Sequence, residues 1–264
     1  MIPFALPACS FEAPASSRMS NQSENSAKKV EIACAGAARE FIAELAHAFT
    51  LTSGSEVSLK FDRSGVVKTR ALDGEAVDVV ITTEAAVDEL AQRQKIASES
   101  AAIVAHSRIG VAMRAGAAKP DIGSVASFRR TLLDAKSIAC ADPATGSPSG
   151  NHFIAMLRRL GIAAEIERKL RLVGAGEGSV VVVCEAVAKG DAEIGIQQIA
   201  EILPFPGIDL VGPLPAELQQ VTVFSAAVGA NSREPELARR FIGFIASAAA
   251  APVITAHGME PPLS

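Results

Sequence analysis

The sequence of 264 residues contains neither tryptophan nor tyrosine, so its 11 phenylalanines are its only aromatic side chains. Proteins that hold single-stranded nucleic acid stack the bases on aromatic side chains. The formal net charge is −4, whereas a surface that binds phosphate backbones needs an excess of lysine and arginine. We therefore expect no nucleic-acid partner, and we expect a ligand held by backbone amides and small side chains.

Long apolar runs and paired cysteines are also missing. No uninterrupted apolar stretch reaches about 18 residues, so we expect no membrane-spanning helix. The four cysteines, at positions 9, 34, 140 and 184, form no Cys-x-x-Cys pair, and the four histidines are scattered. We expect no metal site and no cofactor, and we interpret the cysteines as buried, inert thiols.

Residues 1–29 are rich in serine and proline and show no hydrophobic period, which predicts a disordered tail. No lysine or arginine precedes the short apolar stretch Ile2–Cys9, and Pro3 and Pro7 interrupt it. This stretch does not match a secretory leader, so on this evidence alone a cytoplasmic location stays open.

From Val30 onward, short apolar runs alternate with helical patterns. Val30–Cys34, Val57–Phe61 and Val77–Thr82 are typical of strands, and each precedes a helical segment. This order predicts an α/β fold with parallel sheets covered by helices on both faces. Ile109–Met113 begins a second block, and Val221–Val228 is a late strand that could cross between two lobes. We expect lobe 1 to contain residues 30–107 and 225–264 and lobe 2 residues 108–224, with a cleft between them.

Several loops share one design, in which a strand ends, small or hydroxyl residues follow, and a helix begins. These loops are Ala35–Ala38, Asp62–Gly65, Pro148–Asn151 and Gly174–Ser179. Each can present free N–H groups at the positive end of a helix, which favours an anion. Ligands of open α/β sheets bind at such strand ends. Any one of these loops taken alone is equally consistent with an ordinary helix cap.

Arg63 is the charged residue that points most clearly to a ligand. It stands just before the helix that begins at Ser64, where a guanidinium can grip an anion with two parallel hydrogen bonds. A solvated surface arginine is the alternative. No nucleophile–base pair is evident, so the catalytic residues stay unassigned. His152 could act as a base with Ser149 or be a capped surface residue, and Glu84 could face the cleft or cap its own helix.

Five stretches in fixed order carry a family resemblance: Ile32–Gly36, Phe61–Gly65, Asp78–Thr83, Ala141–Pro143 with Pro148–Gly150, and Gly190–Ile196. From about Val30 to Pro261 the chain resembles the molybdate-binding, type 2 periplasmic solute-binding proteins of ABC importers. The resemblance implies a two-lobed fold, each lobe a central sheet flanked by helices, with the ligand in the cleft. It also implies a monomer in the periplasm, a small anionic ligand and an ABC permease as partner.

The resemblance further implies a set of ligand-binding residues. Ser64 matches a ligand serine, Ser149 and Val180 match backbone-amide ligands, and the whole set is Gly36, Ala37, Arg63, Ser64, Thr83, Ser149, Gly150, Val180 and Gln198. Gly36 and Gln198 replace a ligand serine and a ligand tyrosine, whereas Arg63 adds a fixed cation. A site that loses hydroxyl donors binds its oxyanion less well. Because arginine prefers planar anions, a small organic acid fits better than molybdate.

Two functions follow from the resemblance. The first is a solute-binding protein for a small anion, either an oxyanion or an organic acid. The alternative is an isomerase, because aconitate isomerases resemble the molybdate-binding proteins and move a proton on a tricarboxylate. In that case Arg63 would hold a carboxylate while His152, Glu84 or Glu177 served as the base.

Overall fold

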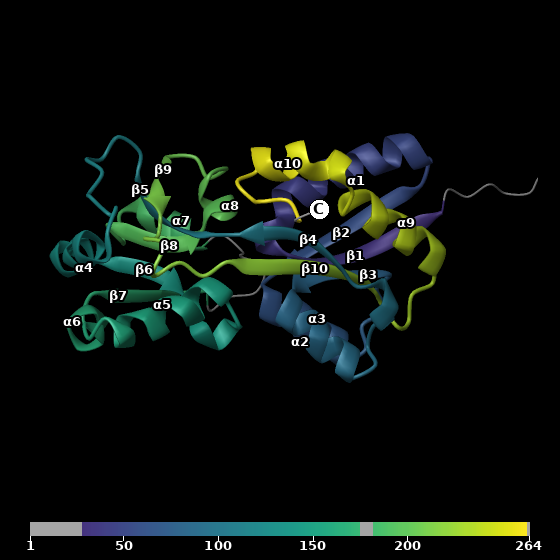
Figure 1. Cartoon of the computed structure of the whole chain (residues 1–264), viewed down its shortest axis with the longest axis horizontal. Helices are drawn as coiled ribbons and strands as arrows, with labels where there is room; N and C mark the ends of the chain where they lie inside the picture. Colours follow the sequence, from purple (N-terminus) through teal and green to yellow (C-terminus); the bar gives the residue numbers. More distant parts are fainter. Residues whose placement is uncertain (1–27, 175–181, 263–264) are drawn as a thin grey trace, which may run out of the picture.

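Two five-stranded sheets, each covered by helices, form two lobes in the computed structural model, which describes residues 28–174 and 182–262 (Figure 1). The lobe 1 sheet has the order β2-β1-β3-β10-β4. Its strands are β1 (Lys29–Ala35), β2 (Glu56–Asp62), β3 (Val79–Thr83), β4 (Ala102–Ser107) and β10 (Thr222–Val228). The parallel arrangement predicted for the first block holds for β1 with β2 and β3, whereas β10 runs antiparallel to both of its neighbours.

The lobe 2 sheet repeats this plan in the order β7-β6-β8-β5-β9. Its strands are β5 (Ile109–Arg114), β6 (Ile138–Ala141), β7 (Leu170–Val173), β8 (Ile194–Gln198) and β9 (Ile208–Pro213). β6 is parallel to β7 and β8, and β5 is antiparallel to β8 and β9. Both sheets are therefore mixed rather than parallel, because in each a strand next to a crossing reverses direction.

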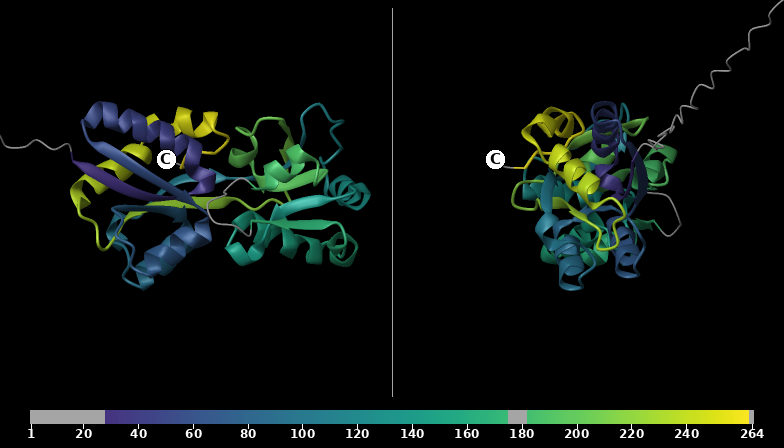
Figure 2. Two further views of the ribbon diagram at one scale, coloured as in Figure 1. Left: turned by 180° about the vertical axis from the view of Figure 1, so that it is seen from behind. Right: turned by 90° about the vertical axis from the view of Figure 1, so that its right-hand side faces the viewer.

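Helices cover both faces of the lobe 1 sheet (Figure 2). One face carries α1 (Arg39–Ser53), α9 (Pro235–Ile245) and α10 (Ala251–Ala256), and the other carries α2 (Ser64–Leu72) and α3 (Glu84–Gln92). Phe41, Leu45 and Phe49 of α1 are buried, as their spacing along one helix face predicts. Phe49 meets Phe241 of α9 edge to face, with ring centroids 5.3 Å apart.

The lobe 2 sheet is covered in the same way. The helices α4 (Val125–Asp134), α5 (Pro148–Arg159) and α6 (Ala163–Glu167) pack on one apolar cluster that includes Phe128 and Phe153. The helices α7 (Val182–Lys189) and α8 (Ile199–Ile202) lie over the opposite face. No single helix in the described ranges is long and apolar enough to cross a membrane; α9 and the segment after it pass that test only together, across a 57° bend.

The chain crosses between the sheets twice. The first crossing lies between β4 and β5, at Arg108, and the second lies between β9 and β10. β10 begins at Thr222, so the boundary expected between residues 224 and 225 falls inside this strand. These paired crossings place the carboxyl ends of β1, β2, β6 and β8 toward the region where the lobes meet (Figure 1).

Candidate functional site

A small cavity is lined by residues of both lobes. Lobe 1 contributes Gly36, Ala37, Arg63, Ser64 and Phe224, and lobe 2 contributes Ala141, Ser147, Pro148, Ser149, Gln197, Gln198 and Glu201. Its volume is about 40 Å³. Most of these residues directly follow a strand or begin a helix, as expected for the ligand site of an α/β fold.

The lobe 1 side is built by the turns after β1 and β2. Gly36 and Ala37 directly follow β1, and Ser64 is the first residue of α2. The Asp62 carboxylate accepts a hydrogen bond from the backbone N–H of Arg63 over 2.8 Å. Ser64 is buried, and its carbonyl accepts a hydrogen bond from the Thr82 hydroxyl over 3.3 Å. Hydrogen bonds with Asp62 and Thr82 therefore hold the turn that carries Arg63 and Ser64.

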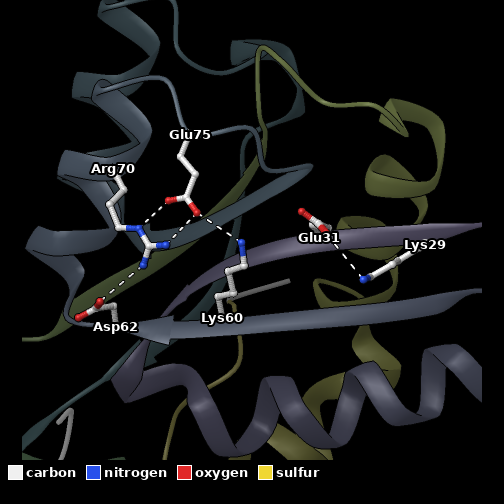
Figure 3. Close-up of polar contacts among 6 residues, drawn as sticks. All are labelled: Lys29, Glu31, Lys60, Asp62, Arg70 and Glu75. Carbon is white, nitrogen blue, oxygen red and sulfur yellow. Dashed lines mark hydrogen bonds and ion pairs between the residues drawn. The ribbon is translucent and has the colours of Figure 1, made fainter. Parts of the chain in front are cut away.

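An ion-pair network supports this turn (Figure 3). Arg70 of α2 makes two hydrogen bonds to Glu75, of 2.5 and 2.8 Å, and its Nη1 lies 3.7 Å from Asp62. Lys60 lies 3.5 Å from the same Glu75 carboxylate, and a separate pair joins Lys29 and Glu31. The hydrogen bond from Arg70 lowers the pKa of Glu75, so the network stays charged at neutral pH.

The lobe 2 side is built by the start of α5. The Ser147 hydroxyl caps this helix by accepting from the N–H of Gly150, and it lies 3.2 Å from the Ser149 hydroxyl. Ser149 is buried and lines the cavity. Gly150 does not line it. A Cβ at position 150 would lie 2.1 Å from the Ala141 carbonyl oxygen, so glycine is what lets α5 approach β6.

Arg63 extends from lobe 1 to lobe 2. Its guanidinium lies against Gly174, which follows β7; a Cβ there would lie 3.3 Å from the Arg63 Nη2 atom. The lobes also meet beside this point, because a Cβ on Gly65 would lie 2.5 Å from the Thr145 carbonyl oxygen and 3.0 Å from the Gly146 Cα. Arg63 thus lines the cavity while it bridges two closely packed lobes.

Gln198 lines the cavity, but its side-chain amide already has partners. The oxygen accepts from the Ser107 hydroxyl over 2.8 Å, and the nitrogen donates to the Thr222 hydroxyl over 3.0 Å. These partners end β4 and begin β10, the strands at the two crossings. Gln198 therefore joins the crossing strands, in addition to lying at the cavity.

Three candidate site residues from the sequence analysis line a different groove. Thr83, Glu84 and His152 line it together with residues of the second crossing. The Thr83 hydroxyl caps α3 by accepting from Ala86 over 3.3 Å, and the His152 Nε2 atom lies 2.7 Å from the Leu218 carbonyl oxygen. Neither Glu84 nor His152 lines the small cavity. Val180 and Glu177 lie outside the described residues.

The small cavity contains an acidic residue that the sequence analysis missed. Glu201 is the third residue of α8, just beyond the β8 strand end. Burial raises the pKa of Glu201 from 4.5 to about 8, although a hydrogen bond from Gln197 and the charges of Arg39 and Arg63 act to lower it. The sequence does hold one indication of this residue, since Glu201 stands four residues after Gln197, near the end of a strand that the apolar pattern predicts.

Gln197 lies beside this carboxyl group. It is buried and lines the cavity, and its side-chain oxygen has no hydrogen-bond partner among the described residues. Its hydrogen bond to Glu201 engages the amide nitrogen, because a carboxylate only accepts.

Three of the four cysteines lie in the described part of the chain, and Cys9 lies outside it. Cys34, Cys140 and Cys184 are free and buried, as predicted. Burial raises the pKa of each of these thiols, to about 12 for Cys140 and Cys184, and none of them lines the cavity. Within residues 28–174 and 182–262, no three His, Cys, Asp or Glu side chains cluster as metal ligands would.

Comparison with known proteins identifies the family. Residues 30–260 match the family described as bacterial extracellular solute-binding proteins. The chain belongs to this family. It is 32% identical over 225 residues to an aconitate isomerase from a Pseudomonas species, and the match covers 83% of each chain.

Solved structures of other proteins share this fold. The periplasmic molybdate-binding protein of Azotobacter vinelandii superposes with a TM-score of 0.74 at 20% identity, over 89% of this chain and 100% of that one. The sulfate-binding protein SubI of Mycobacterium tuberculosis gives 0.70 at 14% identity, over 89% and 87%. The resemblance inferred from the sequence and the two-lobed periplasmic-binding-protein fold are both confirmed.

Proposed function

We propose that the protein binds a small di- or tricarboxylate in the cavity between its lobes and isomerises it by proton transfer. The observation that carries this proposal is a carboxyl group, that of Glu201, inside a site otherwise suited to an anion. Arg63, Ser64 and Ser149 supply the anion-binding side of the same cavity.

A carboxylate suits this site better than molybdate does. Arg63 offers a planar fork of donors that matches a carboxylate. Gly36 brings no hydroxyl group, and the amide of Gln198 is held by Ser107 and Thr222. A tetrahedral oxyanion would therefore find fewer donors than the family's usual ligand set provides.

Proton transfer gives the acidic residue a role that binding alone does not. Fixed negative charge in an anion site weakens binding, whereas a carboxyl group with a pKa of about 8 can both accept and return a proton near neutral pH. In the proposed reaction Glu201 takes a proton from a carbon beside the double bond and returns one to the carbon at the other end of the allylic unit. One C–H bond breaks, one forms and the double bond moves, so no oxidant or cofactor is needed. The aconitate isomerase relative supports this class of reaction.

A solute-binding protein without catalytic activity is the second candidate. Its support is the fold, since the Azotobacter vinelandii protein with the same two lobes is a periplasmic molybdate-binding protein. In that role the protein would act in the periplasm and deliver a small anion to an ABC permease. A cytoplasmic location is the alternative.

Proton NMR in heavy water separates the two candidates. Wild-type protein mixed with cis- or trans-aconitate should exchange the allylic protons for deuterium and interconvert the isomers. Glu201→Gln should slow both processes about 10²- to 10⁴-fold, whereas Glu165→Gln, at an exposed site on α6, should change neither. Binding of aconitate without exchange would contradict the isomerase and leave the binding protein.

A further inference from the structure

A second cavity adjoins the first at Glu201. Its volume is about 120 Å³, and it is lined by Gly36, Arg39, Glu40, Ala200, Glu201, Pro204 and Phe205. Gly36 and Glu201 line both cavities, so the two meet at these residues. We propose that the second cavity receives a second carboxylate of the ligand and that Arg39 binds it. This inference rests on the proposed function and adds to it a residue, Arg39, that selects for a second carboxylate.

The volumes support a ligand that extends into both spaces. The first cavity has a volume of about 40 Å³. A tricarboxylate needs more space than that. The second cavity, of about 120 Å³, shares Gly36 and Glu201 with the first, so a ligand that occupies both would contact the Glu201 side chain.

The guanidinium of Arg39 is held in an orientation that suits carboxylate binding. It is the first residue of α1, and its guanidinium stacks over the Phe61 ring at 4.2 Å from the centroid. Stacking uses the flat face of the guanidinium and leaves its N–H edge available for two parallel hydrogen bonds. Arg39 forms no ion pair with a carboxylate among the residues that the structure describes, whereas Arg70, Arg108 and Arg239 each do.

The other charged groups at the second cavity are Glu40 and Glu201. Arg39 and Arg63 both act on Glu201 by their charges, so this carboxyl group lies within the field of two guanidiniums, one lining each cavity. Glu40 opposes the binding of an anion there. Its neutralisation should therefore strengthen the binding of a ligand that reaches the second cavity.

Titration with unreactive acids tests this subsite without relying on catalysis. Tricarballylate is a saturated tricarboxylate, and butyrate is a monocarboxylate; their affinities can be measured by calorimetry and by ligand-observed NMR. Arg39→Gln should weaken tricarballylate about 10- to 100-fold, since it removes hydrogen bonds to a charged group. It should change butyrate less than about twofold, whereas Arg63→Gln should weaken both ligands. Glu40→Gln should strengthen tricarballylate.

The matched control is Arg129→Gln, at an exposed position on α4, which should change neither affinity. Thermal unfolding verifies that each variant folds. An Arg39→Gln variant that keeps its tricarballylate affinity, or that loses both ligands equally, would overturn the subsite. A wild-type protein that binds tricarballylate but leaves aconitate unchanged would instead contradict the isomerase and retain the subsite.

Discussion

The side-chain amide of Gln198 donates a hydrogen bond to the hydroxyl of Thr222 over 3.0 Å. Thr222 begins β10, and the same amide accepts a hydrogen bond from Ser107 at the end of β4. The Gln198 side chain, which lines the cavity, therefore hydrogen-bonds to both strands that lie next to the crossings between the lobes, β4 and β10. Because these strands are where the lobes would rotate relative to each other, position 198 links the ligand site to the geometry of lobe closure.

Gln198→Ala should destabilise the protein. It leaves two buried hydroxyl groups without their partner, which costs about 2 kcal/mol. The free energy of unfolding in urea measures this loss. Gln92→Ala, at an exposed position at the end of α3, is the control and should change the free energy by less than about 0.5 kcal/mol. Equal stability of the two variants would show that the Gln198 contacts contribute nothing.

The pH dependence of isomerisation should report Glu201. The ionised form is needed to accept a proton, so kcat/KM for aconitate should rise with pH and level off above a midpoint near 8. Glu201→Gln should lower kcat about 10²- to 10⁴-fold and remove this dependence. A wild-type profile without a transition between pH 6 and 9 would argue against this group as the base.

The same substitution should stabilise the fold at alkaline pH. Folding raises the pKa of Glu201 from 4.5 to about 8, so the folded state binds more protons than the unfolded state within that window. Stability is therefore lost as the pH rises from 4.5 to 8. Glu201→Gln should be about 2–4 kcal/mol more stable than wild type at pH 8, with a smaller difference at pH 5. Urea unfolding of both proteins at pH 8 and at pH 5 tests this prediction. The same difference in the free energy of unfolding at both pH values would contradict it.

The contribution of Asp78 to the stability of the fold should depend on pH in the opposite direction. Burial acts to raise its pKa, but hydrogen bonds from the Ser232 hydroxyl and from the backbone of Glu31, Arg233 and Glu234 outweigh it, so the net pKa is lowered. Asp78 therefore stabilises the fold at pH values above 3.8, the ordinary pKa of an aspartate. This stabilisation is lost as the pH falls below that value. Asp78→Ala should cost about 3 kcal/mol at pH 7 and less at pH 3. Exposed Asp88→Asn, on α3, should cost little at either pH.

Gly65→Ala should oppose closure of the lobes. A Cβ at this position would lie 2.5 Å from the Thr145 carbonyl oxygen of the other lobe, and that backbone atom cannot move aside as a flexible side chain would. We expect a larger radius of gyration by small-angle scattering and about 10-fold or more weaker binding of tricarballylate. Gly243→Ala is the control, since nothing lies near that added methyl group. An unchanged radius and affinity would show that this contact does not limit closure.

Much of the fold follows from local sequence patterns. The helix predicted to begin at Ser64 does begin there, as α2, because the end of a strand followed by small residues is a local signal. The antiparallel direction of β10 was not predicted, since strand direction depends on how the chain returns from lobe 2. The short strands β7 and β9 also escaped notice because half-exposed segments of four to six residues carry little periodicity.

The site was less accessible to sequence reasoning. The loops at Gly36, Arg63 and Ser149 meet at one cavity, as the rule for strand ends indicates. Glu201 was missed because α8 has only four residues and no helical period to place it. The partners of Gln198 lie 91 residues before it and 24 residues after it, a separation that no local pattern encodes.

The close approach of Gly65 and Gly146 has a consequence for how specificity could change over time. At this contact backbone meets backbone, so a change of side-chain rotamer cannot make room for an added methyl group. Substitutions at Arg39 or Glu201 would then alter the charge of the interior without changing this contact. A scaffold of this kind can exchange one ligand for another of equal size, or gain and lose a reaction, without being rebuilt.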